Sequence, residues 1–157
     1  MFRYCFGMST LTIGRDVRLR IAALLCLASL VILAYWTAWL LNRSLVATST
    51  SVPYTWFENS FPAADGFLVV CLVLAAWTLV TQRPTALLWL LLGAGGGLYL
   101  FSMDVMYDLQ HGVWGSGANG VIELMINAVT LAISVGLARW SWRRRMTLLA
   151  SPPAPES

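Results

Sequence analysis

The chain has 157 residues, of which 59% are hydrophobic and 11% are charged, and its mean hydropathy is +0.72. An average soluble domain is about 45–50% apolar and about 25% charged, so a soluble monomer of this length could not cover its apolar surface with polar groups. The composition argues against a disordered chain, a nucleic-acid-binding domain and a secreted disulfide scaffold. It indicates an integral membrane protein.

The basic residues are all arginines, and their positions are typical of membrane flanks. The sequence contains ten Arg and no Lys, and its net charge is +3. Six of the ten border long apolar stretches in two short runs, Arg15, Arg18 and Arg20 in the first and Arg143, Arg144 and Arg145 in the second. Basic residues gather in this way beside membrane spans on the cytoplasmic side. The expected partner is therefore the lipid bilayer and not a nucleic acid.

Four stretches are long and apolar enough to cross a bilayer as helices. A hydrocarbon core of about 30 Å needs about 20 helical residues, and in lipid such a segment must satisfy its own backbone hydrogen bonds. The predicted spans are residues 21–41, 63–81, 86–106 and 121–142. The sequence therefore predicts an all-α polytopic membrane protein with an antiparallel four-helix bundle over residues 21–142. Residues 1–20 form a cytoplasmic segment, and residues 143–157 form a basic flank and a disordered tail.

The arginines also predict the orientation. With the N-terminus inside, nine of the ten lie on the cytoplasmic side and only Arg43 lies outside. The positive-inside rule then places both termini in the cytoplasm. A basic set made only of Arg fits a GC-rich bacterial genome and hence an inner membrane. The first span could instead be a cleaved signal peptide, but its apolar region of about 21 residues is too long and no clear cleavage site follows, so we expect a retained helix.

Most of the acidic residues fall on the extracytoplasmic half of this topology. They are five of the seven in the chain, namely Glu58, Asp65, Asp104, Asp108 and Glu123, and the single histidine, His111, follows closely. At about 100° per residue, Asp104, Asp108 and His111 share one face of the third span. Acidic residues inside a membrane are costly and usually face the bundle interior or a wet cavity. The sequence therefore predicts a shared polar pocket at the outer ends of three helices.

Small and polar residues extend these faces toward the middle of the membrane. Gly93 and Gly97 form a G-x-x-x-G pattern on the third span, which allows close helix packing. On the fourth span, Glu123 and Asn127 begin a polar stripe that continues to Thr130 and Ser134. A second small-residue face of the same span points away from the stripe and consists of Ala128, Ala132 and Gly136. This second face could pack against a membrane-protein partner or a second copy, or it could make ordinary contact with the first helix.

Two structural explanations compete with a pocket. Asp65 follows Pro62 and could cap the start of the second span, and Glu123 in the first turn of the fourth span suits the helix dipole. Neither explanation fits Asp104, because that residue lies inside a span and toward the negative end of its helix. We therefore favour the pocket.

The chemistry of the predicted pocket leaves several functions open. Carboxylates and an imidazole can ligate a divalent cation, and the candidate ligands are Asp104, Asp108, His111 and Glu123. Close carboxylates can also share protons, or they can position a small or lipid-like ligand with support from Asp65, Tyr107 and Asn127. The alternatives are a membrane enzyme with carboxylate and histidine acid–base chemistry on a lipid, or an accessory subunit without chemistry of its own. No cofactor motif is evident.

Three segments carry a resemblance to known proteins. Residues 61–65 (FPAAD), 103–112 (MDVMYDLQHG) and 119–123 (NGVIE), together with Asn127, resemble a group of small, uncharacterised bacterial four-helix membrane proteins. The resemblance covers the second to fourth spans and implies a fold but no activity. The chain is also similar to the EXPERA group of four-helix sterol isomerases and ligand-binding proteins in placing acids inside the membrane, although no full motif of that group is present. This second similarity implies a lipid-like ligand.

Overall fold

The computed structural model describes residues 13–47 and 51–150. This part of the chain is helical throughout and contains no strand, which confirms the all-α class. In chain order its helices, including two short 3₁₀ helices marked η, are α1 (Arg15–Leu41), η1 (Arg43–Leu45), α2 (Val52–Glu58), α3 (Pro62–Val80), α4 (Ala86–His111), η2 (Val113–Gly115), α5 (Ala118–Arg143) and α6 (Arg145–Leu149).

Four helical segments are long and apolar enough to cross a membrane. They are Arg15–Leu41, Val52–Val80, Ala86–His111 and Ala118–Arg143, and they cover the four predicted spans except for residue 81 at the end of the second. The helices extend beyond the apolar stretches because backbone hydrogen bonding continues into the polar flanks. α1 begins at Arg15, six residues before the predicted start. α4 ends at His111, five residues after the predicted end, and the next residue, Gly112, has a φ of 64°. A glycine tolerates this left-handed conformation and commonly ends a helix.

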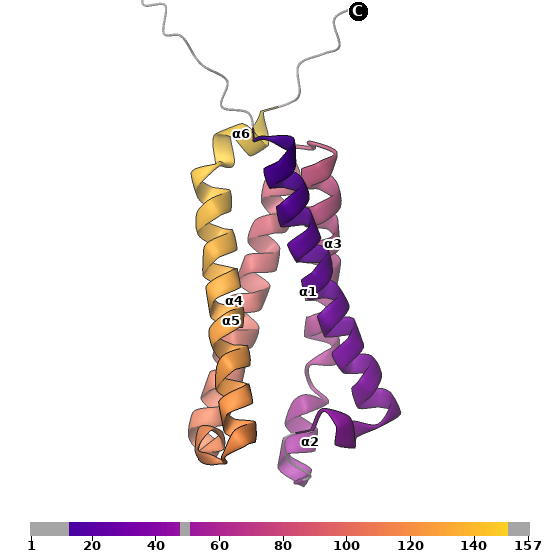
Figure 1. The fold of residues 1–157 in the computed structure, drawn as a ribbon, viewed down its shortest axis with the longest axis vertical. Helices are drawn as coiled ribbons and strands as arrows, with labels where there is room; N and C mark the ends of the chain where they lie inside the picture. The colour runs from indigo at the N-terminus through magenta and orange to yellow at the C-terminus, as the bar shows by residue number, and fades with distance from the viewer. Residues whose placement is uncertain (1–12, 48–50, 151–157) are drawn as a thin grey trace, which may run out of the picture.

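The long helices pack in the order of the chain. α1 packs on α3, α3 packs on α4, and α4 packs on α5. In Figure 1, α1 and α5 stand in front and α3 and α4 lie behind them. Each outer helix thus depends mainly on one neighbour, and most of its large apolar side chains remain exposed.

The contact between α4 and α5 uses small and polar residues. The buried residues of α5 recur every seven positions, at Gly120, Asn127, Ser134 and Ser141. A Cβ atom placed on Gly97 of α4 would overlap the Ser134 hydroxyl, so the two backbones approach closely at this point, as the sequence predicted. Gly93 allows close packing on the other side of α4, against α3, because a Cβ atom placed on it would lie 3.1 Å from a methyl group of Leu72.

The structure does not cover the second small-residue face of α5. Ala128, Ala132 and Gly136 are all exposed, and a Cβ atom on Gly136 would meet nothing within 4 Å. Ordinary contact with the first helix is therefore the wrong explanation for this face. The partner or second copy remains a prediction.

The chain continues as a helix into the predicted basic flank. Residues 145–149 form the short helix α6, which packs against the ends of α4 and α5 and buries Leu148. Its apolar side chains find a surface there, because α5 ends at Arg143 and the chain turns across the bundle (Figure 1). Likewise, residues 15–20 of the predicted N-terminal segment belong to α1. Residues 1–12 and 151–157 lie outside the described part of the chain.

Candidate functional site

Five acidic residues gather at the end of the molecule that carries α2, and we call them the acidic cluster. The members come from four helices and are Glu58 of α2, Asp65 of α3, Asp104 and Asp108 of α4, and Glu123 of α5. The carboxylate of Asp104 experiences electrostatic repulsion from each of the other four. Asp104 is half-buried, and within the described residues no hydrogen bond or ion pair reaches its carboxylate. It is therefore the member whose charge is least compensated.

Asp108 holds α4 and α5 together. Its side chain is only 6% exposed. One oxygen, Oδ2, accepts hydrogen bonds from the side-chain amide of Asn127 at 2.8 Å and from the indole of Trp114 at 2.9 Å. The Asn127 residue is 3% exposed, and its own Oδ1 atom has no hydrogen-bond partner. An unpaired buried acceptor is costly, so this oxygen has an unused capacity for a hydrogen bond.

Asp65 joins α3 to α1. Its Oδ2 atom accepts a hydrogen bond of 2.7 Å from the indole of Trp36. The N-cap residue of α3 is Phe61, which makes no side-chain cap, so the alternative that Asp65 caps this helix is wrong. The alternative for Glu123 is also wrong, because α5 begins at Ala118 and its first turn contains no acidic residue.

Glu58 lies between two tyrosines. Tyr35 of α1 donates a hydrogen bond of 2.9 Å to its Oε2 atom, and Tyr54 of α2 makes a second side-chain hydrogen bond to it. A further bond of 3.1 Å, from the indole of Trp39 to Asn59 Oδ1, also ties the end of α2 to α1. The short helix α2 is thus fastened to α1 by its polar side chains.

Aromatic rings connect α2 to α4 beside the acids. Phe57 stacks on Tyr107 with ring centroids 4.0 Å apart, and Tyr107 stacks on His111 at 4.1 Å. The His111 side chain is exposed, and its Nδ1 atom pairs with the Tyr107 carbonyl at 2.9 Å. These contacts turn the imidazole toward its own helix, although its position on the helical wheel matches that of Asp104.

The arrangement does not support a metal site. Among the described residues, no three His, Cys, Asp or Glu side chains lie in positions that could hold a metal ion. The candidate ligands Asp104, Asp108, His111 and Glu123 are separated because Asp108 is engaged with Asn127 and Trp114 while His111 stacks on Tyr107. The acids gather in one region without forming a compact coordination shell.

Sequence reasoning missed several partners of the acids. Glu58 was recognised as an outer acid but was not placed in the site, and Tyr35, Trp36 and Trp114 match the aromatic belts that flank membranes. The available signal was chemical, because indole N–H and phenol O–H groups usually find a hydrogen-bond partner when buried. Three donors and several carboxylates at one predicted depth therefore indicated pairing, but not which donor pairs with which acid.

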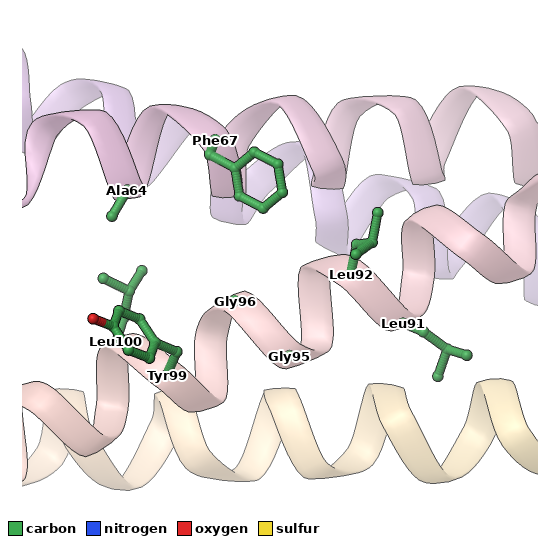
Figure 2. Close-up of a pocket in the computed structure, with 8 residues that line it drawn as sticks. All are labelled: Ala64, Phe67, Leu91, Leu92, Gly95, Gly96, Tyr99 and Leu100. Atoms are coloured by element: carbon green, nitrogen blue, oxygen red, sulfur yellow. The ribbon is translucent and has the colours of Figure 1, made fainter.

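Figure 2 shows an apolar groove on the surface between α3 and α4. It has a volume of about 450 Å³ and is lined by Ala64, Phe67, Leu91, Leu92, Gly95, Gly96, Tyr99 and Leu100. The described residues that line it include no acidic or histidine side chain. Two of these residues adjoin the acidic cluster along the chain, because Ala64 directly precedes Asp65 and Leu100 lies one helical turn before Asp104.

Comparisons with known protein families, with curated proteins and with solved structures found no match to this chain. The resemblance to small bacterial four-helix membrane proteins and the similarity to the EXPERA group therefore remain predictions.

Proposed function

We propose that this chain is a multi-pass inner-membrane protein whose acidic cluster binds a small ligand with a positively charged amino group. The helices would form an antiparallel bundle with both termini in the cytoplasm and the cluster at the outer side. The arginine distribution supports this orientation, because nine of the ten arginines fall on one side and five of the seven acids on the other.

One observation carries the proposal, namely the uncompensated carboxylate of Asp104. The four other acidic side chains of the cluster lie within electrostatic range of it, and like charges repel more strongly in a low-dielectric region. A cation beside Asp104 would offset the repulsion and regain part of the cost of placing acids within the membrane.

The surroundings favour an ammonium group over a metal ion. A metal ion needs several ligands at fixed short distances, and the described acids do not provide such a set. An ammonium group makes looser contacts, including attraction to the faces of aromatic rings. The aromatic side chain of Phe57 lies next to the cluster, where it stacks on Tyr107, and the buried Asn127 Oδ1 has no hydrogen-bond partner within the described residues.

A thermal-stability titration tests the proposal. The purified full chain in detergent is titrated with ethylammonium and tetramethylammonium, with sodium and magnesium at equal ionic strength as reference cations. We expect the ammonium ions to raise the Tm of the wild type at concentrations where sodium does not. Asp104→Asn should lose this shift, and the matched control Asp16→Asn, which changes an exposed acid of α1, should keep it.

Two outcomes would contradict the proposal. The first is an Asp104→Asn variant that responds to ammonium ions as the wild type does. The second is a wild type that responds to pH but to no ammonium ion, which would indicate that the cluster shares protons instead. If Asp104→Asn does not yield folded protein, Glu58→Gln removes a different charge of the same cluster and carries the same expectation.

A second candidate function is that of an accessory subunit that associates through α5. Ala128, Ala132 and Gly136 are exposed on one side of that helix, and small residues at such spacing allow close helix contact within membranes. A second copy of the chain would be the simplest partner.

A further inference from the structure

A second groove lies at the opposite end of the molecule from the acidic cluster. It has a volume of about 280 Å³ and is lined by Arg15, Arg18, Leu19, Val80 and Gln82. Its two walls come from the start of α1 and from the end of α3 with the turn that follows. The packing of α1 on α3 brings these distant segments together.

The groove carries two arginines, and no acidic side chain is among its described lining residues. Within the described residues, no carboxylate forms an ion pair with Arg15 or Arg18. Both arginines lie in the first turns of α1, where the helix dipole is positive and disfavours added positive charge. An anion between the two guanidinium groups would offset both effects, and guanidinium groups bind phosphate oxygens in a fork geometry.

The turn after α3 presents a polar side chain to the same space. Gln82 has φ of 55°, a left-handed conformation that is uncommon for a residue other than glycine. The turn is closed by a 2.8 Å hydrogen bond from Arg83 N to the Thr78 carbonyl. Arg83 itself lies over the Trp77 ring, with its Cζ atom 4.3 Å from the ring centroid. Gln82 is therefore held beside the arginines and can donate a further hydrogen bond to an anion.

The remaining walls of the groove are apolar. Leu19 and Val80 are each 43% exposed, and they line the same groove as the two arginines. Each lies where an apolar helix meets its polar flank, which is the depth of lipid headgroups and the first methylene groups of their chains. Basic pockets between membrane helices on the cytoplasmic side bind anionic headgroups.

We propose that this groove binds one anionic phospholipid, with its phosphate between Arg15, Arg18 and Gln82 and the start of an acyl chain against Leu19 and Val80. The combination of a cationic rim with an apolar wall selects an amphiphilic anion over a free one. The site is separate from the acidic cluster and does not depend on the function proposed for that cluster.

Native mass spectrometry of the full chain in detergent tests the site. The protein is titrated with phosphatidylglycerol, with phosphatidylcholine and with inorganic phosphate. We expect one phosphatidylglycerol to bind in preference to phosphatidylcholine, and we expect phosphate alone to leave this binding unchanged. Arg15→Gln combined with Arg18→Gln should weaken the binding about tenfold. The control pair, Arg143→Gln with Arg144→Gln, removes the same charge from exposed positions of another helix and should bind as the wild type does.

Several results would overturn the site. Equal weakening in both double variants would show general attraction to the basic end of the protein. Competition by free phosphate would assign the groove to a soluble anion, and wild-type binding by the Arg15/Arg18 variant would place the lipid elsewhere. If that variant does not fold, Val80→Trp fills the apolar part of the groove without changing charge. It should also lose the bound lipid, and retained binding would contradict the proposal.

Discussion

Asn127 of α5 donates a 2.8 Å hydrogen bond to the buried carboxylate of Asp108 on α4. This bond joins two helices at a contact where the fully buried positions of α5 otherwise carry only glycine and serine. In a membrane, where the apolar surroundings give helices little hydrophobic reason to associate, such a bond and close packing provide most of the attraction.

Asn127→Ala should therefore weaken the α4–α5 contact. Interhelical hydrogen bonds in membranes contribute about 0.6 kcal/mol on average and up to about 1.7 kcal/mol, and we expect a loss of about 1 kcal/mol, because the acceptor is a carboxylate. The free energy of unfolding can be measured by titration with a denaturing detergent. Asn119→Ala, at an exposed position of the same helix, is the control and should change little. An equal loss in both variants would contradict a specific role for the bond.

Gly97→Ala should destabilise the same contact through overlap. The added Cβ would meet the Ser134 hydroxyl, and its next neighbour would be the Ser134 Cβ at 3.5 Å, an ordinary contact distance. Overpacking of this kind costs about 1–3 kcal/mol, so removing the hydroxyl with Ser134→Ala should restore much of the stability. A double-mutant cycle measures this coupling. Gly95→Ala is the control, since its Cβ meets nothing within 4 Å, and additive effects at positions 97 and 134 would disprove the overlap.

The orientation of the chain can be measured by cysteine labelling in intact cells. With Cys5, Cys26 and Cys71 replaced by Ala, Ser116→Cys lies in the connection between α4 and α5, and Thr85→Cys lies between α3 and α4. A membrane-impermeant maleimide should label position 116 and should label position 85 only after the membrane is opened. The reverse pattern would place the acidic cluster in the cytoplasm and would remove the basis for an outer ligand.

The association of α5 with a second copy can be tested by a cross-link. In the same background, Gly136→Cys should form a disulfide-linked dimer in native membranes under mild oxidation, because close helix contact brings identical residues together across a two-fold axis. Ala23→Cys occupies an exposed position of α1 near the same end of the bundle and should remain monomeric. Monomer alone at both positions would contradict association of copies through this face.

The sequence predicted the long helices well, because the bilayer requires about 20 apolar residues in each span and such runs are read directly from composition. The short helices were harder to predict. α6 lies in the predicted basic flank, and α2 lies in the connection between the first two predicted spans. Contacts with other helices stabilise both of them, including the hydrogen bond of Glu58 with Tyr35 and the burial of Leu148. The residue pattern within a single segment does not predict such contacts.

In the candidate site, too, the sequence predicted positions along each helix but not the contacts between side chains. The helical periodicity predicted that Asp104 and Asp108 share one face of the third span and that Asn127 lies on the polar stripe of the fourth. The structure joins Asp108 to Asn127 by a hydrogen bond. Phase did not separate His111 from these acids, because the direction of its ring depends on stacking with Tyr107. Similarly, the bond between Trp36 and Asp65 spans 29 residues and depends on how α1 packs on α3.

The packing of each long helix on the one that precedes it also bears on how the protein is made. Each long helix after α1 is synthesised later than a helix on which it packs, so the pairs α1–α3, α3–α4 and α4–α5 can form in the order of synthesis. Contacts between neighbours in the chain require only short loops to close, which favours rapid folding. On this view the bond between Asp108 and Asn127 forms after the contacts of α1, α3 and α4, and the acidic region is completed only when α5 has been synthesised.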